Sequence, residues 1–257
     1  WSTQLLSKTA AVLDKTEDAV EFCKLAQHIK DAFIKEFLTA GGRAVSNTQT
    51  AYTLALAFDL VPEAQISEVA ENLYHNVSRF KHITTGFLGT PLISQTLTDF
   101  GYLDMAYLLL NRKEYPSWLY PVTMGATTIW ERWDGQKPDS TFQTPGMNSF
   151  NHYAYGAIGK WMYSTVAGID VDEKHPGYKN IIINPQPGGG LTKAKARIHT
   201  IYGEAASGWV LEDNVLTLSV VVPPNTTAKM ILPADTIENV TVKGKAVHEV
   251  KGFKVLD

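Results

Sequence analysis

The sequence predicts two parts of different fold class, a helical part followed by an antiparallel β-sandwich. Apolar residues recur at helical spacing through residues 1–168 and alternate with polar residues through residues 180–257. A polar stretch carrying Pro176 and Gly177 separates the two patterns. We therefore assign residues 1–168 to the helical domain, 169–179 to a linker and 180–257 to the sandwich.

The first helices differ in how far their apolar side chains spread. A one-sided helix is expected from Thr16, which could cap it, to just before Gly41 and Gly42. Cys23 falls in this helix and is expected to be a small core residue. The next run, QTAYTLALAFDLVP, is apolar on nearly every side, as in a buried helix. A second one-sided helix follows, with apolar residues at Ile66, Val69, Leu73 and Val77.

Further helical runs complete this part. PLISQTLTDFG and YLDMAYLLLN form a pair around Gly101, and MNSFNHYAYGAIGKWMYSTVAG is expected to be the last helix. Alternation of buried and one-sided helices fits a double ring, in which outer helices cover inner ones. About seven helices are visible, fewer than a closed ring of six pairs needs.

The second part carries strand patterns and frequent turn signals. VLTLSVVVPP alternates Leu216, Leu218 and Val220 with polar residues, and KAKARIHTIYG alternates in the same way. Turn residues recur at EDN, PPNTT, PADT and KGK. Short, closely spaced strands of this kind are typical of an antiparallel sandwich.

Composition excludes several classes of protein. The 257 residues carry a net charge of −3 with both signs mixed, so no nucleic-acid partner is expected. No apolar run reaches the roughly 18 residues of a membrane span, and one cysteine excludes an intramolecular disulfide. The N-terminus lacks an initiating Met and a signal core and reads as if it began within a protein, which leaves the location open among periplasm, cell surface and cytoplasm.

One carboxylate stands between two indoles in the stretch TTIWERWDG. Glu131 is flanked by Trp130 and Trp133, within a long connection punctuated by prolines. A sugar site can use all three, because sugar faces stack on indoles and a carboxylate can activate water. In the competing interpretation, the tryptophans plug the loop onto the helices and Glu131 pairs with Arg132 or another cation.

His152 is the second candidate. On a helix, Asn148, Ser149, His152, Gly156 and Gly159 would form a stripe that is polar at its start and lined by glycine further along. The stripe could admit a ligand, or the glycines could serve close helix packing around an interior histidine. No further ligand stands at metal-binding spacing, so neither a metal nor a cofactor is expected.

Two groups of motifs resemble a known family. The motifs TGFLGTPLI, GATTIWERWDG and MNSFNHYAYGAIGKWMY closely resemble bacterial α-L-rhamnosidases of glycoside hydrolase family 78. PGYKNIIINPQPGGGLTKAKA, YGEAASGW and VPPNTTA resemble the C-terminal sandwich of that family. The resemblance implies a partial (α/α)6 barrel before the sandwich and an inverting hydrolase that removes terminal α-L-rhamnose. It makes Glu131 the general base and His152 a sugar contact, with Trp130 and Trp133 shaping the site.

The same resemblance implies that part of the machinery is missing. The family places its general acid in an upstream acidic motif that this sequence does not contain. We therefore expect an inactive C-terminal piece of a bacterial rhamnosidase, which self-associates through its exposed half-barrel or is stabilised by contacts between helices and sandwich. The alternatives are another inverting glycosidase or a phosphorylase of this fold, and a non-catalytic carbohydrate-binding protein.

Overall fold

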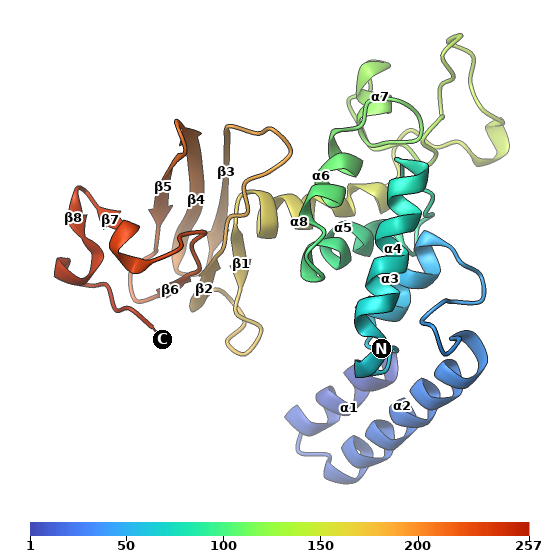
Figure 1. Cartoon of the computed structure of the whole chain (residues 1–257), viewed down its shortest axis with the longest axis horizontal. Helices are drawn as coiled ribbons and strands as arrows, with labels where there is room; N and C mark the ends of the chain where they lie inside the picture. Colours follow the sequence, from blue (N-terminus) through green and yellow to red (C-terminus); the bar gives the residue numbers. More distant parts are fainter. Residues whose placement is uncertain (257) are drawn as a thin grey trace. The chain divides into compact units, whose positions relative to one another are not determined.

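The computed structural model describes residues 1–256, which form two compact units (Figure 1). The first, Trp1–Trp161, is helical, and the second, which begins at Met162, is built on β-strands. The predicted order of a helical part and a β part is confirmed. Strand β1 (Ile169–Val171) lies inside the range 169–179 that the sequence analysis assigns to a linker.

The helical unit opens with a hairpin of α1 (Ser2–Val12) and α2 (Thr16–Phe37), which lie side by side (Figure 1). Thr16 is the first residue of α2 and makes no capping hydrogen bond, so the expected cap is wrong. The expectation for Cys23 is also wrong, since its side chain is exposed. The reason is the same along the whole of α2: none of its residues is buried.

The next helices hold the core of this unit. They are α3 (Gln49–Ala57), α4 (Ile66–Phe80), α5 (Thr90–Asp99) and α6 (Leu103–Asn111), with the short 3-10 turn η1 (Glu63–Gln65) before α4. Helix α3 packs on α4 and α5, and α5 packs on α6. Val69, Leu73 and Val77 of α4 are buried one turn apart, as the apolar spacing predicts.

The last helical segment is shorter than predicted. After α7 (Leu119–Thr123) and the turn η2 (Pro145–Met147), regular structure resumes only at η3 (Ala154–Ala157), α8 (Ile158–Trp161) and the π-helical η4 (Met162–Val166). Residues 148–153 are not helical, so the single helix expected over residues 147–168 is wrong. The backbone groups of this stretch bond instead to residues 128–131, an option that sequence spacing cannot reveal.

The β unit is a sandwich of two three-stranded sheets. One sheet has the order β1-β2-β6, with β2 (Asn180–Ile183) in the centre and β6 (Thr227–Met230) at its edge. The other has the order β3-β4-β5, formed by Lys193–Thr200, Gly203–Glu212 and Val215–Val221. A two-stranded ribbon, β7 (Thr241–Val242) with β8 (Lys245–Ala246), and the turns η5 (Ile237–Asn239) and η6 (Val247–Glu249) follow.

One strand pair departs from the antiparallel prediction. β2 pairs with β6 in parallel, with Asn180 opposite Thr227, while the other strand pairs are antiparallel in the part of the chain described. The whole β3-β4-β5 sheet intervenes between the two strands, so the chain can re-enter the first sheet in the direction of β2. Ile169, Ile181 and Ile183 from one sheet and Ala205 from the other are buried between them.

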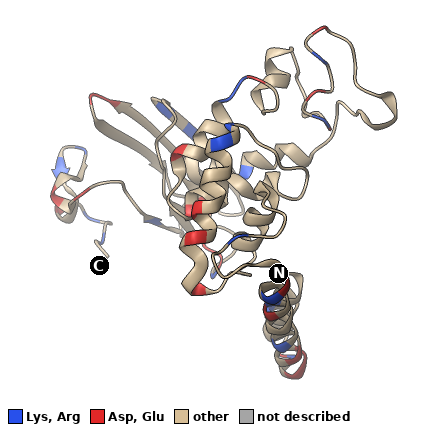
Figure 2. Ribbon diagram, turned by 45° about the vertical axis from the view of Figure 1, so that its right-hand side comes forward, with Lys and Arg blue, Asp and Glu red and all other residues tan. Residues whose placement is uncertain are grey.

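Charge is spread over the molecule without a large tract of one sign (Figure 2). Within residues 1–256 no helix is long and apolar enough to cross a membrane. The same residues contain no cluster of three or more His, Cys, Asp or Glu side chains placed to hold a metal ion.

Candidate active site

Two segments of the helical unit lie side by side and bring the predicted site residues together. The amide of Glu131 donates to the carbonyl of Ser149 at 2.8 Å, and the amide of His152 donates to the carbonyl of Ile129 at 2.9 Å. The Thr128 hydroxyl donates to the Phe150 carbonyl at 2.5 Å. These bonds connect the WERWD segment to the residues before η3, so the backbones of Glu131 and His152 lie in neighbouring segments.

One oxygen of the Glu131 carboxylate is held by a hydrogen bond. Its Oε2 atom accepts a hydrogen bond of 2.8 Å from the Ser149 amide, which closes a reciprocal pair with the bond from the Glu131 amide. Within residues 1–256 no basic side chain lies within 4.0 Å of this carboxylate. Arg132 faces Asp134 instead, at 3.6 Å. The structure therefore does not show the Glu131–Arg132 pair of the competing interpretation.

The two tryptophans pack differently. Trp130 is only 6% exposed and meets Phe150 edge to face, with ring centroids 5.1 Å apart. Trp133 stacks on Tyr155 with centroids 3.7 Å apart and planes 6° apart, and Trp118 meets its ring edge to face at 5.5 Å. Such aromatic pairs contribute about 0.5–1.5 kcal/mol each beyond the area they bury. Both tryptophans thus fasten the loop that carries Glu131.

The Asp134 carboxylate interacts with neighbouring side chains of the same loop. Besides its contact with Arg132, it accepts a hydrogen bond from the Gln143 side-chain amide. Burial raises the pKa of Tyr155 and of Tyr120, and the negative charge of Asp134 raises both further. These phenols therefore stay protonated at neutral pH, and Tyr120 donates to the carbonyl of Gln136 at 2.9 Å.

His152 lies in a loop rather than on a helix, and this corrects the predicted stripe. Its Nδ1 atom accepts a long hydrogen bond of 3.4 Å from the Ala154 amide. Acceptance at Nδ1 corresponds to the tautomer that carries its proton on Nε2, and this N–H group can donate to a ligand. The imidazole stacks on Phe87, with centroids 4.8 Å apart and planes 14° apart.

A small cavity lies under the WERWD segment. It holds about 40 Å³ and is lined by Trp118, Pro121, Val122, Thr128, Ile129, Trp130, Trp133 and Tyr155. Pockets for small molecules commonly span about 300–1,000 Å³, so this cavity can take water but no sugar ring.

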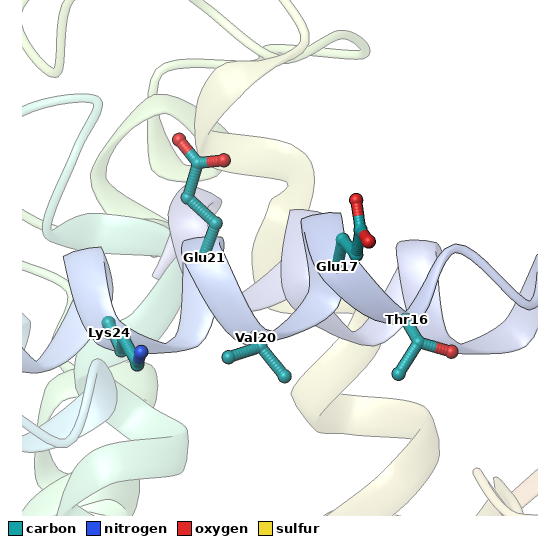
Figure 3. Close-up of a pocket in the computed structure, with 5 residues that line it drawn as sticks. All are labelled: Thr16, Glu17, Val20, Glu21 and Lys24. Carbon is teal, nitrogen blue, oxygen red and sulfur yellow. The ribbon is translucent and has the colours of Figure 1, made fainter.

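A wider hollow of about 420 Å³ lies on helix α2 (Figure 3) and shares no lining residue with the small cavity. It is lined by Thr16, Glu17, Val20, Glu21 and Lys24, all from the same helix. Glu17 and Glu21 extend to one side of the helix and Val20 to the other, so the side chains do not converge on a ligand (Figure 3). This hollow is therefore not a candidate active site.

The side chains that support the site carry little signal in the sequence. Phe87 comes from the loop between α4 and α5, and Tyr155 and Trp118 come from segments on either side of the WERWD loop. The indole of Trp118 donates to the Tyr155 carbonyl at 2.9 Å. The only local sign of Phe87 is that this phenylalanine stands between glycines in TTGFLGT, a pattern that places an apolar ring on a turn.

Comparison with known families shows the class of protein to which the chain belongs. Residues 1–166 match the family model described as the bacterial alpha-L-rhamnosidase 6 hairpin glycosidase domain, and residues 168–247 match the bacterial alpha-L-rhamnosidase C-terminal domain. The chain belongs to this family of bacterial α-L-rhamnosidases, which are glycoside hydrolases.

Particular relatives are similar over most of the chain. An alpha-L-rhamnosidase of Formosa agariphila is 44% identical over 99% of this chain and 28% of its own length. One from Streptomyces avermitilis is 43% identical over 91% of this chain and 22% of its own length. The chain therefore spans about a quarter of the length of these relatives.

Solved structures show the same similarity. The crystal structure of the Streptomyces avermitilis alpha-L-rhamnosidase complexed with L-rhamnose matches 91% of this chain and 22% of its own, with a TM-score of 0.86 and 42% identity. The native rhamnosidase from Aspergillus terreus matches 91% of this chain and 27% of its own, with a TM-score of 0.87 and 37% identity.

Proposed function

We propose that this chain is the C-terminal part of an inverting α-L-rhamnosidase and supplies the general base, Glu131, for removal of terminal α-L-rhamnose. The observation that carries the proposal is the setting of the Glu131 carboxylate. One oxygen is held by the Ser149 amide, and no basic side chain of residues 1–256 neutralises the group. A carboxylate that is fixed but unpaired can accept a proton from water.

The reaction follows from the placement of two carboxyl groups on either side of the glycosidic bond. Glu131 takes a proton from a water molecule, whose oxygen forms a bond to the anomeric carbon while the bond to the leaving oxygen breaks. A carboxylic acid on the other side protonates that leaving oxygen. Inverting enzymes hold the two carboxyls about 6.5–9.5 Å apart to leave room for the water, and the product has the opposite anomeric configuration.

His152 and the two tryptophans complete the proposed site. In this scheme the Nε2–H group of His152 donates to a sugar hydroxyl, because Nδ1 faces the Ala154 amide. Trp133 and Trp130 shape the site chiefly by fixing the loop, since the first stacks on Tyr155 and the second is buried.

We further propose that the isolated chain does not turn over rhamnosides. The acidic residue nearest to Glu131 in the loop is Asp134, only three positions away. Asp134 is engaged by Arg132 and Gln143. Two carboxylates on one short loop cannot readily flank a sugar from opposite sides, so Asp134 is a poor general acid.

Self-association of the isolated chain belongs to the same proposal. The hairpin of α1 and α2 exposes large apolar side chains, and the largest exposed fractions in residues 1–37 are those of Val12, Leu13, Trp1, Leu6, Val20 and Phe37. Exposed apolar surface of this kind favours association. Sedimentation velocity over a range of concentrations tests it, and a single monomeric species throughout would contradict it.

The experiment is Glu131→Gln in the longer rhamnosidase that we propose contains this chain, assayed on an activated α-L-rhamnoside. Loss of a general base commonly lowers the rate by about 10²–10⁴-fold. The matched control is Glu63→Gln, at an exposed glutamate on η1, which should keep wild-type turnover. NMR of the first product formed should show the β-anomer.

Other outcomes would point to the alternatives. Wild-type turnover by Glu131→Gln removes this residue from the mechanism, and an α-anomer as first product excludes inversion. Turnover that requires inorganic phosphate indicates a phosphorylase. Binding of rhamnose without any turnover of α-glycosides by the longer protein indicates a carbohydrate-binding protein. Turnover by the isolated chain above that of its own Glu131→Gln variant contradicts the proposed inactivity.

A further inference from the structure

Phe87 touches the proposed site although it is 65 positions away from His152 in the sequence. Its ring stacks on the imidazole of His152 at 4.8 Å and also meets Tyr155 at 5.3 Å with planes 49° apart. The side chain is nevertheless 38% exposed. An apolar ring at the surface, parallel to a histidine that could contact a sugar, suggests a role beyond packing.

The loop that carries Phe87 is held from both ends. The side-chain amide of Gln49, itself fully buried, donates to the His82 carbonyl at 3.0 Å and accepts from the Thr84 amide at 2.8 Å. Thr85 and Thr90 share a buried hydrogen bond of 2.7 Å between their hydroxyls. The position of Phe87 is therefore set by α3 and α5 and does not depend on His152.

Gly89 fastens the same loop from inside. A Cβ atom at this position would lie 2.8 Å from Thr85 Cγ2 and 3.0 Å from the Thr50 hydroxyl, so the backbone packs closely against both threonines. The loop has little room to shift. An aromatic ring on such a rigid loop can give a neighbouring side chain a fixed surface to pack against.

The His152 ring has few other restraints. Its backbone amide is bonded to Ile129, which places the residue without fixing the plane of the ring. The Nδ1 contact with the Ala154 amide is long, at 3.4 Å. The neighbouring Tyr153 ring is nearly parallel at 5.5 Å, but Tyr153 is 88% exposed and so gives little support.

We propose that Phe87 is a positioning residue, which holds the His152 imidazole in the plane that directs Nε2–H toward the sugar. This inference rests on the proposed function, in which His152 contacts the substrate. Histidine χ2 has broad, shallow preferences, so without a stacked partner the ring would sample several planes and lose part of its donated hydrogen bond.

The first test uses the 257-residue chain itself and does not depend on activity. NMR of the histidine ring protons should show that Phe87→Ala shifts the His152 resonances downfield, because the shielding from the stacked ring is lost. Phe87→Tyr keeps the ring and should leave them near their wild-type positions. Leu88→Ala is the matched control, because Leu88 is the next residue of the loop and is 73% exposed.

The second test uses the longer rhamnosidase. Loss of one stacked aromatic contact corresponds to a rise of KM of about 2–10-fold, with kcat per folded enzyme nearly unchanged. Phe87→Leu should behave like Phe87→Ala, because leucine fills space without offering a plane, and Phe87→Tyr should restore the wild-type KM. A merely structural role would instead lower the amount of active enzyme and leave KM unchanged.

The outcomes separate this inference from the function on which it rests. A wild-type KM for Phe87→Leu and Phe87→Ala, beside a raised KM for His152→Ala, overturns the inference alone. A wild-type KM for His152→Ala overturns both. Unshifted His152 resonances in Phe87→Ala overturn the inference whatever the kinetics show.

Discussion

The buried amide of Gln49 offers a direct test of how the fold supports the site. Gln49→Leu keeps the approximate volume but removes both hydrogen bonds to the loop of Phe87, one to the His82 carbonyl and one from the Thr84 amide. Gln49 is 0% exposed, so the leucine would place an apolar side chain where both backbone groups now have a hydrogen-bond partner.

The expected magnitude follows from these contacts. Each backbone group left without a partner costs about 1–3 kcal/mol, which gives about 2–6 kcal/mol for the two. The apolar leucine side chain gains roughly 1–2 kcal/mol from its own burial. Combining these ranges gives a net loss in the free energy of unfolding of about 0–5 kcal/mol, centred near 2–3 kcal/mol, and each kcal/mol lowers Tm by about 2–4 °C.

The assay is urea and thermal unfolding of the chain, followed by far-UV circular dichroism and tryptophan fluorescence. The matched control is Gln27→Leu, which removes an exposed hydrogen bond of 2.8 Å to Asp31 on α2 and should cost well under 1 kcal/mol. Equal stability of Gln49→Leu and Gln27→Leu would refute the reasoning, because it would mean that the two bonds to the loop contribute nothing.

Two further predictions concern the β unit. Gly168→Ala should destabilise this unit by about 2–5 kcal/mol, since Gly168 has φ +74° and a Cβ would lie 2.1 Å from the backbone nitrogen of Pro185. Gly177→Ala is its control, with φ +90° but open space around the Cβ, so only the backbone strain remains and unfolding curves should separate the two. A hydrogen bond from His175 lowers the pKa of Asp172. The ionised Asp172 carboxylate therefore stabilises the folded chain at pH values above the ordinary aspartate pKa. This contribution is lost as the pH falls through the lowered pKa. In His175→Ala an NMR titration should show the pKa of Asp172 moved upward, and an unchanged value would contradict this pairing.

Local pattern sufficed where the structure depends on neighbours in sequence. The apolar spacing of Val69, Leu73 and Val77 predicted the buried face of α4, because side chains one turn apart share a face of any helix. The alternation in Leu216, Leu218 and Val220 likewise predicted β5, since successive side chains of a strand point to opposite faces. The motif WERWD also marked the loop that contains Glu131.

The same patterns misled where the chain found distant partners. Residues 148–153 have apolar residues at helical spacing, yet they form no helix because their backbone groups bond to residues 128–131. Cys23 sits in a helical pattern, but its side chain is exposed because α2 buries none of its residues. Parallel pairing of β2 with β6 depends on the route of the chain through a second sheet.

The sequence by itself determined most of the helices and strands, the family and the residues proposed to act on the sugar. Only the tertiary structure decided what surrounds them. It showed that Trp130 is buried, that Glu131 is held by Ser149 and that Phe87 stacks on His152. Helical and strand periodicity arise from bonds and side-chain directions within a few residues, which a single sequence records. Contacts between residues tens of positions apart form only when packed helices bring their loops together. A pattern over a few neighbouring residues does not predict which loops will be in contact.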